Sequence, residues 1–151
     1  MKQLDGTVDV SGKPATPRRA VAQCVLTASE DAITRIREDT LPKRGAVGTA
    51  RAAGLLAAKR AADLIPHCHP IALTSTAVDF HFEANTVKVT CEVSALDRTG
   101  PEMEALCGAT LAALTLYDLI KAICPGPRLD AARLLEKEGG KSGHWRAEEQ
   151  A

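Results

Sequence analysis

The heptapeptide LIPHCHP, residues 64–70, places two histidines around a cysteine and closes the group with prolines. Residues two apart in extended backbone share a face, so His67 and His69 are expected to point together while Cys68 points away. Three hypotheses fit this group: a metal clamp, a cysteine nucleophile with its histidine base, or a rigid shelf for a substrate. Two ligands do not complete a metal site, and adjacent residues on opposite faces rarely reach hydrogen-bond contact. The prolines therefore favour the shelf, with surface histidines on a rigid turn as the simpler alternative.

Asp118 and Lys121 lie three residues apart in the apolar stretch ALCGATLAALTLYDLIKAI. On a helix they can face the same way, and an ordinary surface ion pair is the simpler explanation. Two observations favour a functional role. The C-terminal end of a helix disfavours a negative charge, and the apolar neighbours predict burial, where a charge needs partners. A carboxylate and an ammonium group held together in such a place can exchange protons with a ligand near neutral pH.

The other polar motifs each have an ordinary explanation when taken singly. Acids in the first turn stabilise a helix, which accounts for the segment Glu102-Met103-Glu104. The segment GGKSG, residues 139–143, lacks the glycine and the following helix that a phosphate-binding P-loop requires, so it is interpreted as a glycine turn. Three further cations are consistent with solvated surface charge: Arg18, Lys43 and Lys137.

The length of 151 residues predicts a single domain, 1–151, with loosely ordered segments at 1–17 and 143–151. Nineteen basic and nineteen acidic residues cancel, which argues against a nucleic-acid-binding protein that works through a broad basic face. The sequence has no run of 18 apolar residues and no hydrophobic signal region at its start, so we expect no membrane span and a cytoplasmic location. The five cysteines form no C-x-x-C motif and are predicted to be free thiols.

The elements that must position these residues follow from hydrophobic periodicity. Alternation predicts a strand over about 18–28, a hairpin over 78–93 and a last strand over 128–137, and helical spacing predicts helices over about 30–39, 47–65 and 102–123. Small residues give the 47–65 helix a smooth face that permits close approach of another backbone. This order predicts an α+β fold, a ferredoxin-like sandwich in which helices pack on one face of an antiparallel sheet. The last helix has the Glu102–Glu104 acids at its start and Asp118 near its end.

Four motifs occur in a characteristic order: LLAAKRAADLIPHCHPIALT, DRTGPEMEAL, ALTLYDLIKA and RLLEKEGGKSG. Together they resemble the molybdenum cofactor biosynthesis protein C family, the cyclic pyranopterin monophosphate synthases, from about Val8 to Gly143. The resemblance implies a lyase that converts 3′,8-cyclo-7,8-dihydro-GTP to cyclic pyranopterin monophosphate with release of pyrophosphate. It also implies a ferredoxin-like subunit in a homohexamer, a trimer of dimers, with active sites between subunits.

The resemblance assigns a role to each candidate residue. Asp118, Lys121 and the loop lysine Lys43 are implied to be catalytic, and Lys121 would act as acid and base with a pKa lowered by neighbouring cations or by burial. The implied substrate-binding residues are His67, Cys68, His69, Met103, Glu104, Arg18 and Lys137, of which the last two meet the phosphates. The ring chemistry needs no cofactor and no metal, and Mg²⁺ is expected only as a companion of the triphosphate.

Three positions depart from the family pattern. His67 stands where the family usually has Leu, the loop has Lys43-Arg44-Gly45 in place of Lys-Gly-Asp, and Arg98 stands where a lysine is common. The alternative hypothesis is a non-catalytic oligomeric module that binds a nucleotide triphosphate. Such a module would keep Arg18 and Lys137, but it would not need Asp118 and Lys121.

Overall fold

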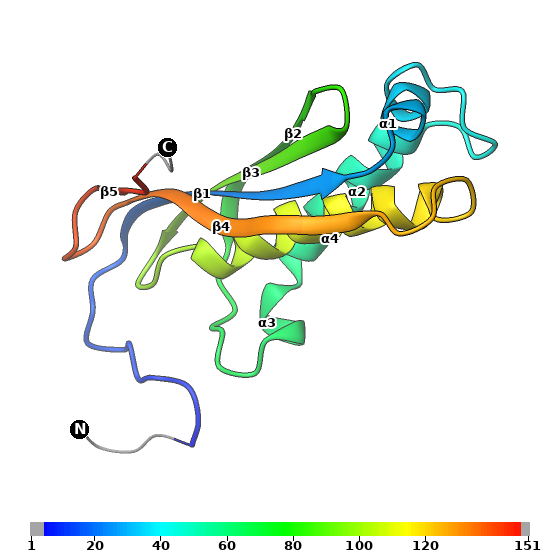
Figure 1. Cartoon of the computed structure of the whole chain (residues 1–151). Coiled ribbons are helices and arrows are strands. Elements are labelled where there is room, and N and C mark those ends of the chain that lie inside the picture. The colour runs from blue at the N-terminus through cyan, green and yellow to red at the C-terminus, as the bar shows by residue number, and fades with distance from the viewer. Residues whose placement is uncertain (1–4, 149–151) are drawn as a thin grey trace.

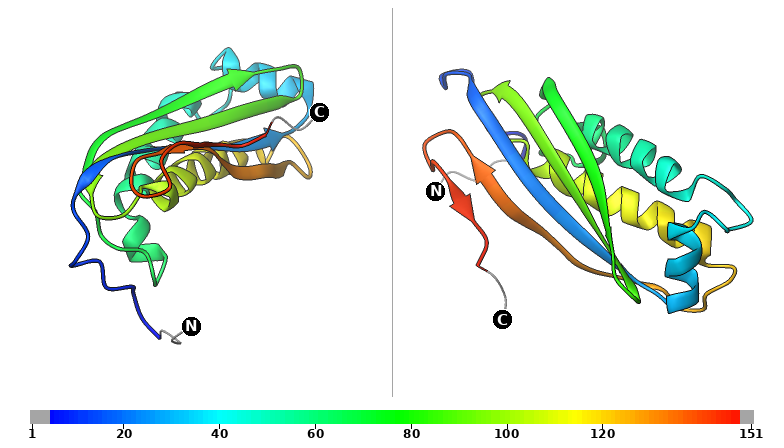
Figure 2. Two further views of the ribbon diagram at one scale, coloured as in Figure 1. Left: turned by 90° about the vertical axis from the view of Figure 1, so that its left-hand side faces the viewer. Right: turned by 90° about the horizontal axis from the view of Figure 1, so that it is seen from above.

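The computed structural model of the chain describes residues 5–148 and contains one five-stranded sheet (Figure 1). In chain order the elements are β1 (Thr16–Thr27), α1 (Glu30–Arg37), α2 (Ala46–Lys59), α3 (Ala61–Leu64), β2 (Leu73–Phe82), β3 (Thr86–Asp97), α4 (Glu102–Ile120), β4 (Arg128–Glu138) and β5 (Trp145–Arg146). The strand order is β2-β3-β1-β4-β5, and all neighbouring strands are antiparallel. Helices α2 and α4 lie side by side against one face of this sheet (Figure 2). The predicted α+β fold is confirmed.

The central strand β1 shows why the sheet has one apolar face. Its alternate residues Ala20, Ala22, Cys24 and Leu26 are buried, and the β3 residues opposite them, Val93, Cys91, Val89 and Val87, are buried as well. Side chains alternate between the two faces of a strand, so these positions form one continuous apolar surface. Helix α4 packs on that surface, in contact with β1, β3 and β4.

Helices α2 and α4 approach each other closely at two glycines. A Cβ atom on Gly54 would lie 2.8 Å from the carbonyl oxygen of Gly108, and one on Gly108 would overlap the sulfur of Cys91. Buried alanines flank this contact on both helices. The smooth face predicted for the first of these helices is confirmed, and it fixes the position of α4 beside α2 on the sheet.

Helix α4 is long and apolar enough, by length and composition, to cross a membrane. In this fold it serves as the core helix instead, because residues along its length are buried against the sheet and α2. All five cysteines are free thiols, as predicted, and three of them belong to the buried core.

The structure differs from the sequence prediction in element bounds, since β2 begins at Leu73, β3 ends at Asp97 and α4 ends at Ile120, and in two further features. The predicted helix 47–65 is two helices, because Arg60 adopts a non-helical backbone conformation (φ −115°, ψ 15°) between α2 and α3. The predicted tail after Lys137 contains the short strand β5, which pairs with Glu136 and Lys137 of β4. Glycines with positive φ in the intervening turn let the chain reverse, and the exposed edge of β4 then offers backbone partners.

A pair of glycine substitutions in α2 tests the close contact. Gly54→Ala is expected to lower the free energy of unfolding by about 1 to 3 kcal/mol, because the new methyl group meets backbone that cannot move aside cheaply. Gly48→Ala, at an open position of the same helix, is expected to raise it by up to about 1 kcal/mol. Urea denaturation at matched protein concentration measures both. Equal effects of the two substitutions would contradict the close helix contact.

Candidate active site at the two ends of α4

The LIPHCHP segment forms a turn that rests on the start of α4. Helix α3 ends at Leu64 because Ile65, which precedes Pro66, adopts extended backbone. The chain then turns, and the Cys68 amide donates a hydrogen bond to the Ile65 carbonyl at 3.0 Å. The Cys68 thiol donates to Oε1 of Glu104 at 3.6 Å, which ties the turn to the first residues of α4.

The two histidines of this turn contact the N-terminal segment. His67 Nδ1 lies 2.9 Å from the Gly6 carbonyl oxygen, and His69 Nε2 lies 2.6 Å from that of Val8. A carbonyl oxygen only accepts, so each of these ring nitrogens must bear the proton and donate it. The expectation that the two histidines point together is confirmed. Their predicted contact with substrate remains a prediction.

The environment of Cys68 argues against the nucleophile hypothesis. Burial, together with the neighbouring Glu104 carboxyl, raises the pKa of the Cys68 thiol to about 11, and a nucleophilic cysteine needs the thiolate form near neutral pH. Glu104 itself is only 4% exposed, and burial raises the pKa of its carboxyl. Among the described residues its Oε2 has no hydrogen-bond partner. A buried acceptor of this kind is suited to a donor group of a bound ligand.

The two predicted phosphate-binding cations lie at the same end of α4. Lys137 sits opposite Ala20 in the β1–β4 pair, on the face that the helices cover, and its Nζ is 3.3 Å from Oε1 of Glu102. Arg18 is oriented by two hydrogen bonds, from Nε to the Thr16 hydroxyl at 2.9 Å and from a terminal nitrogen to the Arg98 carbonyl at 3.1 Å. The structure therefore groups both cations with the start of α4 and the LIPHCHP turn.

Asp118 and Lys121 lie at the opposite end of α4 and are exposed. Asp118 Oδ1 is 2.5 Å from Lys121 Nζ, and the two side chains are 56% and 62% accessible to solvent. The hydrogen bond from Lys121, and to a smaller extent the charge of Lys43, lowers the pKa of Asp118. All three predicted catalytic residues thus lie near one another.

Two expectations about this pair were wrong for the single chain. The apolar sequence predicted burial, but Asp118 shares a helix face with Leu114, which is 45% exposed, so this face points away from the core. The pKa of Lys121 was expected to be lowered, whereas its hydrogen bond to Asp118 raises it. The open face explains both results, because it provides no burial and leaves Asp118 as the main charged partner of Lys121.

The two groups of site residues are far apart. Glu104 and Asp118 are separated by fourteen residues of continuous helix, a rise of about 21 Å. Proton transfer requires hydrogen-bond contact or one bridging water. The acid–ammonium pair and the turn of one chain therefore cannot act on the same reacting atoms.

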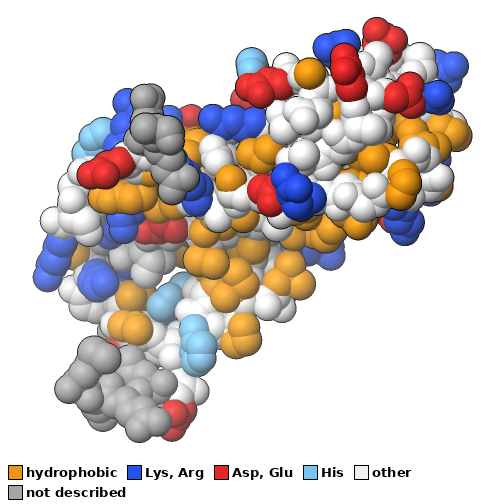
Figure 3. All heavy atoms as spheres, in the orientation of Figure 1, with side chains coloured by type: hydrophobic (Ala, Val, Ile, Leu, Met, Phe, Trp, Pro, Cys, Tyr) orange, Lys and Arg blue, Asp and Glu red, His pale blue; other side chains and the backbone are white. Residues whose placement is uncertain are grey.

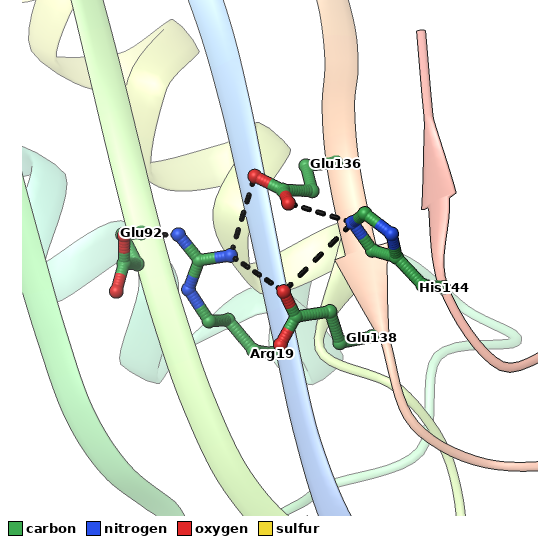
Figure 4. A network of polar contacts seen from close by, with 5 residues as sticks. All are labelled: Arg19, Glu92, Glu136, Glu138 and His144. Carbon is green, nitrogen blue, oxygen red and sulfur yellow. Dashed lines mark hydrogen bonds and ion pairs between the residues drawn. The ribbon is translucent and has the colours of Figure 1, made fainter.

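A charged network that the sequence did not suggest lies on the other face of the sheet (Figure 4). Arg19 is 2.8 Å from Glu92, 3.3 Å from Glu136 and 3.4 Å from Glu138, and so it links β3, β1 and β4. His144 is 2.7 Å from Glu136. Within residues 5–148, Glu136, Glu138 and His144 are the one trio of His, Cys, Asp or Glu side chains close enough to hold a metal ion, but Arg19 already supplies a positive charge there. The alternation of Glu136 and Glu138 along β4 is visible in the sequence. Their partner Arg19 could not be predicted, because it depends on the register between β1 and β4.

The fold and the site define the class of protein: an α+β chain with the Asp118–Lys121 ion pair at one end of its core helix and the LIPHCHP turn at the other. Comparison with known proteins identifies the family. Residues 7–140 match the MoaC family, and the chain belongs to it.

Three relatives illustrate how closely the chain matches. It is 49% identical over 138 residues to cyclic pyranopterin monophosphate synthase 2 of Mycobacterium tuberculosis (strain ATCC 25618 / H37Rv), covering 91% of this chain and 83% of that protein. It is 49% identical over 144 residues to the cyclic pyranopterin monophosphate synthase of Pelobacter propionicus, covering 94% and 90%. It is 46% identical over 142 residues to that of Novosphingobium aromaticivorans, covering 94% and 90%.

The buried Glu104 carboxyl should make stability depend on pH. A carboxyl whose folded-state pKa is raised stabilises the fold below its unfolded value, near 4.5, and this contribution is lost as the pH rises through the folded-state value. Glu104→Gln should abolish that loss, so at pH 8 the variant should be more stable than the wild type by about 1 to 3 kcal/mol. Chemical denaturation at pH 4 and pH 8 measures it, with exposed Glu83→Gln as control. A pH-independent difference would contradict the assignment.

The Arg19 network should have the opposite pH dependence. The hydrogen bond from Arg19 lowers the pKa of Glu92, so the stability it contributes is present above about pH 4.5 and is lost as the pH falls through the depressed value. Because these groups are partly exposed, Arg19→Met should lower the free energy of unfolding by roughly 0.5 to 1 kcal/mol at pH 7 and by less at pH 3. Thermal unfolding across this range tests the sign, with Lys88→Met, at an exposed position of β3, as the control.

Proposed function

We propose that the chain is a cyclic pyranopterin monophosphate synthase, a lyase of molybdenum cofactor biosynthesis. It converts 3′,8-cyclo-7,8-dihydro-GTP to cyclic pyranopterin monophosphate and releases pyrophosphate. The observation that supports this most directly is the grouping of Asp118, Lys121 and Lys43 within a chain that belongs to the MoaC family. The three relatives described above are named cyclic pyranopterin monophosphate synthases.

The complete active site is proposed to form between chains. The separation along α4 prevents the two groups of one chain from sharing a substrate, whereas a second chain can bring its own turn and phosphate-binding cations to Asp118. Large apolar side chains gathered on the helical side of the molecule are available for such contact (Figure 3). They include Leu56, Leu64, Leu114 and Ile123. Exposed apolar side chains on this scale favour association, and we propose the homohexamer, a trimer of dimers.

In such a site Lys121 is the proposed acid and base, and Asp118 orients it. Within one chain Asp118, with a smaller contribution from Tyr117, raises the pKa of Lys121. Cations brought by a second chain would offset that effect and lower the pKa of Lys121 toward neutrality, where it can both donate and accept a proton. Lys43 supplies further positive charge beside Asp118. The reaction rearranges a purine-derived ring and closes a cyclic phosphate, so it needs several proton transfers.

The turn and the start of α4 are proposed to bind the substrate. The neutral thiol of Cys68 is a weak donor. The Oε2 atom of Glu104, which has no partner within the described part of the chain, is a buried acceptor for a ring N–H group. Met103, 37% exposed, offers an apolar contact beside them. Arg18 and Lys137 are proposed to neutralise the triphosphate and the leaving pyrophosphate.

The proposal needs no cofactor for the ring chemistry, and Mg²⁺ would enter only with the triphosphate. The partner is a small molecule, so neither nucleic acid nor a membrane takes part. We propose a cytoplasmic location, in keeping with a diffusible substrate. Turnover that persists in the presence of EDTA would support the metal-independent chemistry.

Anaerobic incubation of the purified protein with 3′,8-cyclo-7,8-dihydro-GTP tests the function. After oxidation, a fluorescent pterin and pyrophosphate should appear in equal amounts. If the substrate is bound but stays intact, the chain is the non-catalytic nucleotide-triphosphate-binding module instead.

Asp118→Asn should lower turnover by at least about a hundredfold, because the amide cannot hold Lys121 as an ionic partner or accept a proton. Asp79→Asn, on the exposed side of β2, is the matched control and should keep wild-type turnover. Size-exclusion chromatography should show unchanged assembly for both variants. An active Asp118→Asn variant would remove Asp118 from the mechanism.

A further inference from the structure

The two histidines of the LIPHCHP turn donate hydrogen bonds to two carbonyl groups of the N-terminal segment. His67 and His69 are two residues apart, and the carbonyl groups to which they donate, those of Gly6 and Val8, are two residues apart as well. We call this pair of hydrogen bonds the histidine clasp and residues 6–13 the strap. Because each histidine meets its own carbonyl, the clasp fixes the register of the strap as well as its position.

The strap ends in a turn that holds the backbone of Lys13. The Asp9 carboxylate accepts a hydrogen bond from the Ser11 amide at 2.9 Å, and the Lys13 amide donates to the Val10 carbonyl at 3.0 Å. The Arg98 guanidinium donates from Nε to the Lys13 carbonyl at 2.9 Å. Both backbone polar groups of Lys13 are therefore engaged, and the direction of its side chain follows from the position of the strap.

Lys13 lines a cavity of about 350 Å³ that contains two further cations, Arg18 and Lys141. Ser142 adds a hydroxyl group, and Gly140 leaves room for the Arg18 guanidinium, which a side chain at that position would overlap. None of the described residues that line the cavity is acidic. Three cations from two chain segments, 13–18 and 140–142, with no carboxylate among the described lining residues, define a site for a polyanion.

We infer that the histidine clasp is a positioning device: it holds the strap so that Lys13 completes a polyphosphate-binding cavity with Arg18 and Lys141. His67 is a positioning residue, because it acts through Lys13 and touches no phosphate itself. The inference rests on the proposed function only for the identity of the natural ligand, a nucleotide triphosphate.

A double-mutant cycle tests the inference with inorganic tripolyphosphate as the probe and calorimetry as the readout. His67→Ala and Lys13→Ala should each weaken binding about tenfold, since each removes one cation from its working position. The double variant should bind no more weakly than Lys13→Ala alone, because His67 acts only through Lys13. Wild-type affinity in His67→Ala, or effects that multiply in the double variant, would overturn the inference.

Matched variants separate positioning from general damage. His67→Asn should restore binding, since its amide nitrogen can donate in place of Nδ1. Amide hydrogen exchange of residues 6–13 should be faster in His67→Ala and normal in His67→Asn. Lys88→Ala and His81→Ala, exposed on the β2–β3 hairpin, should bind like the wild type. Equal exchange rates in His67→Ala and the wild type would also overturn the inference.

Binding of tripolyphosphate involves no turnover, so the binding experiment and the enzyme assay can each fail independently of the other. If the cycle behaves as described but no pterin forms, the clasp stands and the proposed function fails. If pterin forms but His67→Ala binds tripolyphosphate normally, the function stands and the clasp fails.

Discussion

The packing of α4 against the sheet and α2 holds the two ends of this helix at a fixed separation. The contact is close because glycines and alanines face one another, so backbone atoms of the two helices approach where larger side chains would keep them apart. A helix held in this way is a rigid spacer of about 28 Å over its nineteen residues. The functional groups at each end cannot move toward one another without disrupting the core.

Because of this constraint, the charged groups at the two ends of α4 have different environments. At its start, Glu104 is buried and its Oε2 has no hydrogen-bond partner among residues 5–148, and Cys68 is held as a neutral thiol beside it. At its end, Asp118 and Lys121 are exposed and satisfy each other. The first group has a hydrogen-bond acceptor that lacks a donor, so it is suited to a ligand that brings one. The second group can exchange protons near neutral pH only if its surroundings change and lower the pKa of Lys121. In the proposed assembly, one contact between chains would supply both requirements.

Much of the fold was predictable because local periodicity reports it. The alternation around Cys24 and Val89 marked β1 and β3, and the apolar run before Asp118 marked α4. The break at Arg60 was missed because no proline or glycine marks it, and β5 was missed because a two-residue strand has no periodicity.

The site could be predicted only as far as residue types allow. The sequence identified the candidate residues, and family resemblance assigned their roles. It could not show that Asp118 is exposed, because hydrophobicity all around a helix does not distinguish the core from an interface between chains. Nor could it show that His67 and His69 hold Gly6 and Val8, since that contact joins residues 61 positions apart. Long-range contacts of this kind depend on the whole fold.

The most direct test of the account is complementation between two inactive variants, Asp118→Asn and Lys137→Ala. Chains of both kinds would carry different affinity tags, be reassembled together and be purified through both tags in turn. If each site combines Asp118 of one chain with Lys137 of another, the mixed assemblies should recover about a quarter of wild-type turnover, as random pairing restores one site in four. Mixed assemblies no more active than either variant alone would contradict a site shared between chains.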